Sequence, residues 1–195
     1  MFSLSKLSPS ITDMIRFDHS HVLVTFHQYT STTRPSVKKA LGETICDALE
    51  MHATLEEEIF YPAFRSVDAS DPVILKAEPE HMEMKRLVAE LRGADAASPR
   101  HDQRIHHLMR DVMHHVTDEE TVLLPQAERA MSLTRLEELG AQMTRRRLEL
   151  IKPKAGRIAK NTALGFSGST TAIVVGLASA LMAARFVSNR VGKSA

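Results

Sequence analysis

The chain has 195 residues, of which 43% are hydrophobic and 25% charged, and its formal net charge is +1. This composition excludes low-complexity disorder, and the single cysteine, Cys46, excludes a disulfide-stabilised scaffold. Residues 1–10 do not resemble a secretory signal, so we expect a cytoplasmic protein. Charge is unevenly distributed: residues 1–144 carry 15 basic and 23 acidic side chains, whereas residues 145–195 carry ten basic side chains and one acidic. We therefore expect the acidic body and the basic tail to have different roles.

Four segments repeat apolar residues at steps of three and four, which predicts amphipathic helices and an all-α core. The expected helices run from Ile11 to Tyr29, from Ser36 to Tyr61, from Pro72 to Gly93 and from Asp102 to Leu124. Proline interrupts backbone hydrogen bonding, so Pro62 and Pro125 are expected to end the second and fourth helices, and Pro79 to separate or kink the first turn of the third. A further amphipathic helix is expected over residues 131–151.

The two halves of this core contain the same motif. In each half, a histidine is followed by a glutamate four residues later and by a proline ten residues later. The two copies are His52, Glu56 and Pro62, and His115, Glu119 and Pro125. A second histidine precedes each copy: His19 lies 33 residues before His52, and His81 lies 34 residues before His115. The repeat predicts two helical hairpins, each contributing a lone histidine and a His-x-x-x-Glu pair.

These four histidines and two glutamates fall on the apolar stripes that should face the bundle axis. Ionisable groups are costly to bury there unless they are paired or bind a cation. Imidazoles and carboxylates at this spacing can hold two metal ions. A set of four imidazoles and two carboxylates favours iron over manganese or zinc. The candidate metal ligands are His19, His52, Glu56, His81, His115 and Glu119.

The other histidines and acidic residues receive different interpretations. His21 is the alternative to His19 as a ligand. Three further histidines are expected to be solvated: His101, His106 and His107. The alternative for these three is a secondary role in metal loading. An exposed acidic face is expected for Glu57, Glu58 and Glu120, although Glu57 or Glu120 could support a ligand from outside the first coordination shell.

The combined pattern resembles a hemerythrin-like (HHE) cation-binding domain. The resemblance rests on Asp18-His19, His52-x-x-x-Glu56-Glu57, Glu80-His81 and His115-x-x-x-Glu119-Glu120. It covers about residues 10–130 and implies an up-down four-helix bundle of the hemerythrin type. It also implies a non-haem di-iron centre in which Glu56 and Glu119 bridge the two irons.

Two positions depart from the oxygen-carrying hemerythrins. Those proteins have a second histidine four residues after the third-helix ligand, where this chain has Lys85. Their last motif is His-x-x-x-x-Asp, whereas this chain has His115-x-x-x-Glu119. The ligand set resembles the branch associated with nitric oxide, peroxide or iron–sulfur repair. One histidine fewer leaves more open coordination, which favours reactivity over oxygen storage.

The C-terminal region divides into an amphipathic helix with a basic linker, residues 131–160, and an apolar tail helix within residues 161–195. Residues 161–184 lack charge, are flanked by basic residues and are long enough to cross a bilayer, so they are a candidate anchor to the cytoplasmic membrane. A ladder of small residues could also support oligomer formation: Gly168, Ala172, Gly176, Ala180 and Ala184. The alternative is a soluble helix packed on the bundle or on another subunit. No nucleic-acid-binding module accompanies the basic residues, so no nucleic-acid partner is expected.

The sequence therefore predicts a di-iron protein that binds or reacts with O2, NO or peroxide, or that handles iron in a stress response or in iron-centre repair. One alternative is a regulatory module stabilised by its metal, with the tail docking to a membrane or a partner. A second alternative is an oxygen carrier. Whether the chain is an enzyme stays open at this stage.

Overall fold

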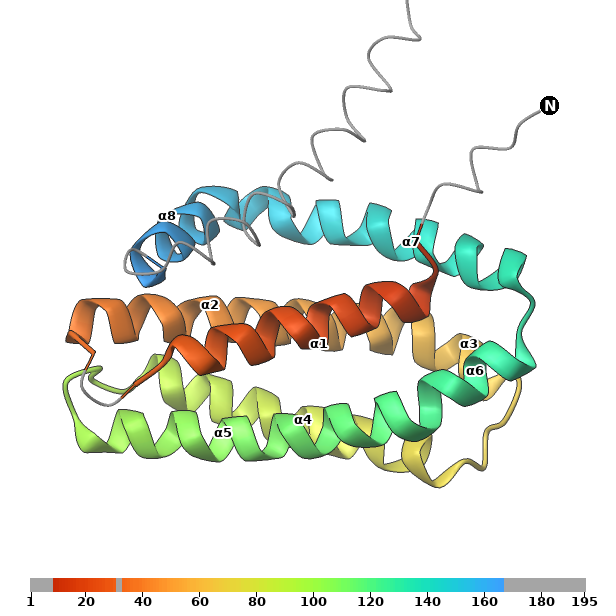
Figure 1. The fold of residues 1–195 in the computed structure, drawn as a ribbon, viewed down its shortest axis with the longest axis horizontal. Helices are drawn as coiled ribbons and strands as arrows, with labels where there is room; N and C mark the ends of the chain where they lie inside the picture. Colours follow the sequence, from red (N-terminus) through yellow and green to blue (C-terminus); the bar gives the residue numbers. More distant parts are fainter. Residues whose placement is uncertain (1–8, 31–32, 167–195) are drawn as a thin grey trace, which may run out of the picture.

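The computed structural model describes residues 9–30 and 33–166, and every regular element in these ranges is helical, which confirms the all-α prediction. Four of the helices form the core of the molecule, and along the chain each runs in the opposite direction to the one before it (Figure 1). They are α1 (Ile11–Gln28), α2 (Pro35–Leu55), α4 (Pro72–Arg92) and α5 (Pro99–Asp118), and we refer to them with their continuations as the bundle.

Two of these helices continue past the prolines that were expected to end them. A π-helical turn, η2 (Glu56–Phe60), joins α2 to α3 (Tyr61–Arg65), and a second, η3 (Glu119–Leu123), joins α5 to α6 (Leu124–Ala130). In η2 the Tyr61 N–H donates to the Glu56 carbonyl five residues earlier. Each proline then lies in the first turn of a new α-helix, where its missing N–H is tolerated. The predicted ends at Pro62 and Pro125 were therefore wrong.

Helix α4 is continuous through Pro79. The hydrogen bond that Pro79 cannot make would go to the carbonyl of Leu75, and both residues are exposed, so water can replace that bond. The start of α4 is fixed by Asp71, whose carboxylate accepts from the backbone N–H groups of Val73 and Ile74.

The core has two apolar parts with a polar layer between them. One part gathers around Ile11, Ile15 and Phe60, and the other around Phe26, Ile45 and Leu108. On α1 the buried positions between Ile15 and Val22 include only His19. The bundle axis therefore carries its polar side chains at mid-length, inside an otherwise apolar core.

Two more helices lie over the α1–α2 side of the bundle (Figure 1). They are α7 (Leu133–Ile151) and α8 (Ala155–Gly165), joined by the 3₁₀ turn η4 (Lys152–Lys154). Helix α7 buries Leu136, Leu139 and Met143 against the first apolar part of the core. Its Gly140 lies so near the start of α1 that a Cβ atom there would be 2.2 Å from the Pro9 carbonyl oxygen.

Within the two described ranges, none of the helices combines the length and apolarity needed to cross a membrane. Residues 161–166 belong to the end of α8 and the residue after it. The candidate anchor is otherwise outside the described residues, as is the ladder of small residues that begins at Gly168.

Candidate metal centre

All six predicted ligands lie together at mid-length of the bundle, and none is more than 4% exposed. They form two groups of four whose potential ligand atoms lie within 4.8 Å of one another. One group is His52, Glu56, His81 and His115, and the other is His19, His52, Glu56 and Glu119. The groups share His52 and Glu56, so the six side chains form one continuous cluster of potential metal ligands.

The π-helical turns place a further polar group at this centre. Five residues make about 1.4 turns of an α-helix, so Tyr61 would not share a face with Glu56 in a regular helix. With the wider turn between them, the Tyr61 hydroxyl lies 3.1 Å from a Glu56 oxygen and 2.9 Å from Glu119 Oε1. It is also 3.2 Å from His81 Nε2. The hydroxyl thus links the carboxylates of the two repeats.

Several buried polar atoms in this cluster lack hydrogen-bond partners within the described residues. They are His19 Nε2, both ring nitrogens of His52, Glu56 Oε1 and Glu119 Oε2. Such orphaned atoms are rare and costly in protein cores. They are also the donor atoms that a transition-metal ion would use, so the residues fit a metal centre.

Carboxylates surround the four histidines on their outer side. Each carboxylate comes from a different rod than the histidine it faces, where a rod is one long helix of the bundle with its continuation. The distances from histidine Nδ1 to the carboxylate oxygen are 2.9 Å for His19 and Glu120, 3.8 Å for His52 and Asp18, 3.0 Å for His81 and Glu57, and 2.9 Å for His115 and Glu80. We call these four acidic residues the outer carboxylates. A carboxylate at Nδ1 fixes the ring and leaves the Nε2 lone pair directed inward.

The inward direction of the Nε2 lone pairs is plainest for His81 and His115, whose Nε2 atoms are only 3.1 Å apart. With the hydrogen of each ring on Nδ1, facing Glu57 and Glu80, the two Nε2 lone pairs point at each other. A proton or a cation between the rings relieves this repulsion. The geometry therefore fits a cation bound by both nitrogens.

The electrostatics of the cluster agree with this interpretation. Burial alone would raise the pKa of Glu56, but the adjacent imidazoles, His52 foremost, hold that pKa well below its usual value. Burial would likewise lower the pKa of His115, but Glu119 and Glu56 raise it to about 10. Without metal, the raised pKa of His115 keeps a proton in the cluster, which partly balances the buried carboxylates. Metal binding would therefore displace protons.

Comparison with known proteins agrees with the site. The family model described as the hemerythrin HHE cation binding domain matches residues 10–127. The chain belongs to this family. A crystal structure of a hemerythrin HHE cation binding domain-containing protein from Mycobacterium kansasii superimposes with a TM-score of 0.64 at 17% identity, covering 77% of this chain and 93% of that one. That similarity shows a shared fold.

A curated relative is a protein named DNA nickase from Nostoc sp. (strain PCC 7120), 32% identical over 119 residues. The match covers 60% of this chain but 33% of the relative. The hemerythrin-like chain thus spans about a third of the length of that protein.

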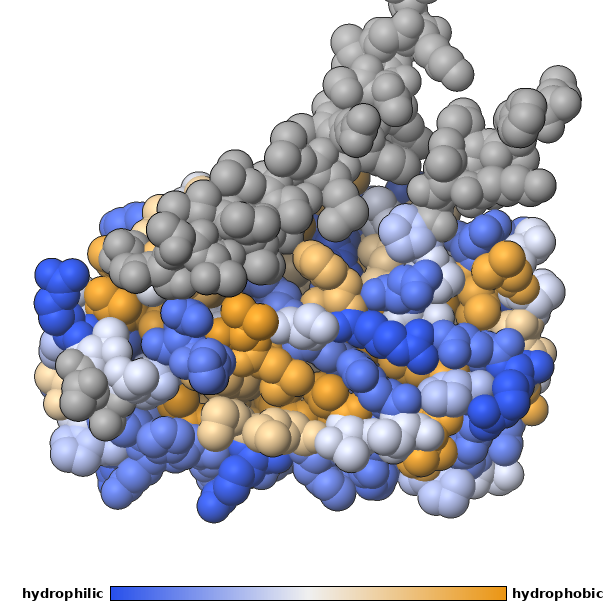
Figure 2. All heavy atoms as spheres, viewed as in Figure 1, coloured by the Kyte–Doolittle hydropathy of each residue, from blue (hydrophilic) through white to orange (hydrophobic). Residues whose placement is uncertain are grey.

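A small cavity adjoins the hemerythrin-type centre. It has a volume of about 10 Å³, room for roughly one water-sized molecule. Its polar lining residues are Asp18, His19, His52 and His115, and the others are apolar: Val22, Leu49, Met84, Val112 and Val116. Hydrophobic side chains also gather on the surface where α1 and α5 lie side by side (Figure 2).

The remaining histidines divide between confirmed and wrong predictions. His106 is exposed, as expected, and His27 is exposed as well. His101 was expected to be solvated, but it is 3% exposed, and its Nδ1 lies 2.7 Å from the Tyr29 hydroxyl. The prediction failed because His101 lies one turn before the apolar Ile105 and shares its buried face. His21 is partly buried and belongs to neither group of potential ligands.

The outer carboxylates are the functional residues that the sequence indicated least clearly. Glu57 and Glu120 were expected on an exposed face, with a supporting role as the alternative, and both are partly buried against histidines. Lys85 occupies the position at which the oxygen-carrying hemerythrins have a histidine. Its ammonium lies 2.7 Å from both oxygens of Glu57. Its cation therefore supports an outer carboxylate from the surface.

Proposed function

We propose that this chain is a non-haem di-iron protein that binds or reacts with O2, NO or peroxide. The observation that carries the proposal is the pair of ligand groups sharing His52 and Glu56. In this proposal Glu56 and Glu119 bridge the two ions, and the histidines complete the coordination. Iron is favoured over manganese or zinc because a mixed imidazole and carboxylate set in a helical bundle suits redox-active iron.

Two iron ions would supply open coordination positions and electrons to a small ligand. The protein's own contribution is selection and support. The apolar side chains around the cavity, such as Val22 and Val112, favour a small uncharged molecule over ions. Tyr61 holds the Glu56 and Glu119 carboxylates through its hydroxyl, and the outer carboxylates keep the imidazoles oriented.

The first experiment measures metal content and the absorption spectrum of the aerobically purified chain. The proposal predicts about two irons per chain and oxo-bridged ferric absorption bands in the near ultraviolet and visible. Addition of NO or peroxide to the reduced protein should then change the spectrum. One zinc ion, or no metal in a folded chain, would overturn the di-iron proposal.

Single ligand variants test which residues hold the metal. His52→Ala should lose most of the metal, because His52 belongs to both ligand groups, and His115→Ala should lose at least one ion. His106→Ala is the control, since His106 is exposed on the same helix as His115. Retention of two irons by both core variants would contradict the ligand assignment.

Two other functions share the same metal centre. In a metal-stabilised regulatory module, folding would depend on metal but the spectrum would not respond to O2, NO or peroxide, and the tail would dock to a membrane or a partner. In an oxygen carrier, the spectrum would change reversibly with O2. Lys85 disfavours the carrier, because its side chain pairs with Glu57 at the surface and adds no ligand.

Action on DNA is a second candidate, and its support is the name of the Nostoc relative. Several basic side chains of α7, η4 and α8 already face acidic residues of the bundle, which reduces their availability to phosphates: Arg146, Arg147, Lys154 and Arg157. Incubation with supercoiled plasmid, with and without iron, tests this candidate. Metal-dependent relaxation that His115→Ala abolishes would support it, and intact plasmid would exclude it.

A further inference from the structure

Helix α7 reaches the metal centre although it lies outside residues 10–127, the part of the chain that the family model matches. The Arg147 guanidinium contacts Asp18 through two nitrogens, with distances of 2.5 and 2.6 Å to the two carboxylate oxygens. Asp18 Oδ2 in turn lies 3.8 Å from His52 Nδ1. A chain of charged contacts therefore runs from the added helix to a predicted ligand.

His52 is the histidine for which this support matters most. It belongs to both ligand groups, so its orientation affects both metal positions. Its Nδ1 lacks a hydrogen bond among the described residues, whereas the other three histidines each have an outer carboxylate within 3.0 Å. Asp18 is the outer carboxylate at His52 Nδ1, and both of its oxygens are bound by Arg147.

Two of the other three outer carboxylates, Glu57 and Glu80, contact cations from within the bundle. Lys85 contacts Glu57, and Lys76 lies 3.6 Å from Glu80. Arg147 makes the same kind of contact from a different element, and its side chain is only 17% exposed. A guanidinium with two parallel contacts fixes the plane of a carboxylate in a way that a single ammonium cannot.

We propose that Arg147 is a positioning residue of the metal centre, which holds Asp18 in place and through it orients His52. This inference rests on the proposed metal-binding function. It makes α7 part of the metal centre rather than a separate appendage. Detachment of α7 would release Asp18 and weaken metal retention.

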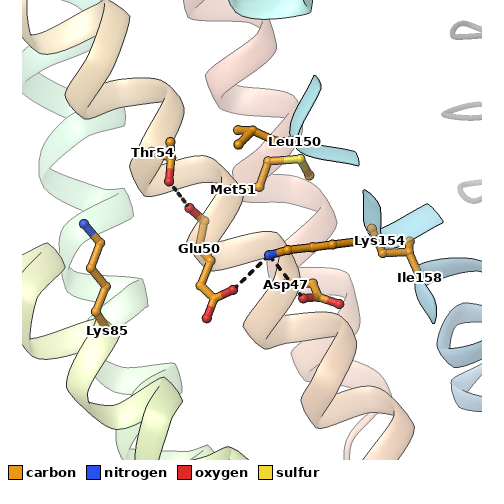
Figure 3. Close-up of a pocket in the computed structure, with 8 residues that line it drawn as sticks. All are labelled: Asp47, Glu50, Met51, Thr54, Lys85, Leu150, Lys154 and Ile158. Atoms are coloured by element: carbon orange, nitrogen blue, oxygen red, sulfur yellow. Dashed lines mark hydrogen bonds and ion pairs between the residues drawn. The ribbon is translucent and has the colours of Figure 1, made fainter. Parts of the chain in front are cut away.

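Other contacts hold the added helices in the register that this role requires. Lys154 reaches from η4 to Glu50, 3.2 Å away, and to Asp47, 3.8 Å away, beside a pocket formed with Met51 and Leu150 (Figure 3). Arg157 of α8 lies 2.5 Å from Asp47. Helices α7 and α8 are thus attached to α2 on the C-terminal side of Arg147 as well as by the apolar side chains of α7.

The test compares Arg147→Gln with Arg146→Gln in the full chain. Arg146 is a matched control, since it precedes Arg147 directly and also contacts a carboxylate with two nitrogens, but that carboxylate is Glu58 on the surface. The probes are Fe²⁺ and Co²⁺ alone, with the rate of transfer to a chelator as one readout. The visible spectrum of the Co²⁺ form is the other, because it reports coordination rather than stability.

We expect Arg147→Gln to release metal about 10- to 100-fold faster than the wild type and to alter the Co²⁺ spectrum. Arg146→Gln should do neither, and Arg147→Lys should restore part of the retention. Asp18→Asn should match Arg147→Gln, and the double variant should lose no more than either. This non-additivity separates a shared role from two independent structural defects.

Two results would overturn the inference while the wild type still binds metal. One is equal metal release and equal Co²⁺ spectra for Arg147→Gln and Arg146→Gln. The other is an additive loss in the double variant. A wild-type chain that binds neither ion would instead refute the proposed function. Unfolding curves of the metal-free variants show whether each one folds, and Asp18→Asn provides the test if Arg147→Gln does not.

Discussion

Tyr61 is the residue at which the two halves of the repeat meet. Its hydroxyl contacts Glu56 from the first half and Glu119 from the second. Burial raises the pKa of this hydroxyl well above its usual value, and the two carboxylates raise it further. The neutral hydroxyl is therefore a hydrogen-bond donor to buried carboxylates in the metal-free protein.

Tyr61→Phe removes this donor. We expect it to lower the free energy of unfolding of the metal-free protein by about 1–3 kcal/mol, because buried carboxylate oxygens lose a partner. The effect should be smaller in the metal-loaded protein, in which cations satisfy the same oxygens. Urea unfolding of both forms measures the difference. Equal losses with and without metal would contradict this role.

His101 makes stability depend on pH at the opposite end of the bundle from η2. Burial, followed by the nearby Lys38 cation, lowers its pKa, although Asp102 opposes the shift. The unfolded chain therefore binds a proton at higher pH than the folded chain. Stability attributable to His101 is complete above pH 6.5, the usual histidine value, and falls as pH decreases from there towards the lowered pKa.

His101→Gln should remove this dependence, since glutamine does not titrate and can still donate to the Tyr29 hydroxyl oxygen. We expect the wild type to lose more unfolding free energy than the variant between pH 7.5 and pH 5. Urea unfolding at the two pH values measures it. A difference that stays constant would show that His101 does not titrate in this range.

The apolar stripe of each helix predicted that the six candidate ligands would meet. Each stripe is buried against the others, so every residue on it faces the axis of the bundle. The outer carboxylates were harder to predict. Glu57 and Glu120 follow the stripe glutamates by one position and so point sideways, towards a neighbouring rod. Periodicity within a single helix carries no information about such contacts between helices. The acidic residue beside each motif position was their only signal in the sequence.

Among the elements, the π-helical turns decide the geometry of the centre. They begin at the predicted ligands Glu56 and Glu119, and each is followed by a proline in the first turn of the next α-helix, with Tyr61 before the first proline and Leu124 before the second. Proline usually signals the end of a helix, and here it follows a widened turn instead. Sequence patterns do not distinguish these cases, since both depend on which carbonyl the preceding N–H groups reach.

Helix α7 is fixed by close approach to the start of α1. A Cβ atom on Gly140 would overlap the Pro9 carbonyl oxygen and lie 3.1 Å from backbone atoms of Ser10 and Ile11, and these backbone atoms cannot rotate away. Gly140→Ala should therefore lower the free energy of unfolding by about 1–3 kcal/mol. Gly156→Ala, in α8, has open space within 4 Å and should be neutral or stabilising by up to about 1 kcal/mol.

Thermal unfolding of the two glycine variants checks this prediction. Similar melting temperatures for both would show that α7 is not held against α1. A lower melting temperature for Gly140→Ala, together with faster metal release, would also agree with the role inferred for Arg147, which lies seven residues further along the same helix.

At the scale of the whole molecule, the charges of the acidic body, residues 1–144, and of the basic segment that follows it are complementary. The sequence suggested separate roles for them, because net charge per segment does not show which charges face each other. In the structure, Arg146 contacts Glu58, and Lys154 and Arg157 contact acidic residues of α2. The first part of the basic segment thus stabilises the bundle. The rest of the tail is outside the described residues, and its role stays a prediction.

The metal centre should also control global stability, since its six candidate ligands come from all four rods of the bundle. A ligand that binds only the folded state stabilises it by about 4 kcal/mol when its concentration is 1,000 times its Kd. In a domain of this size, 1 kcal/mol corresponds to roughly 2–4 °C in Tm.

We therefore expect removal of metal by a chelator to lower the Tm by roughly 10 °C. Calorimetry of the loaded and the stripped chain at one pH measures the change. His52→Ala is the control, because a variant that binds little metal should show the same Tm with and without chelator. Equal Tm values for the loaded and stripped wild type would mean that the bundle closes around its buried imidazoles and carboxylates without help from a cation. In that case the protons on His19 and His115, whose pKa values are raised, would be sufficient to balance the buried charge.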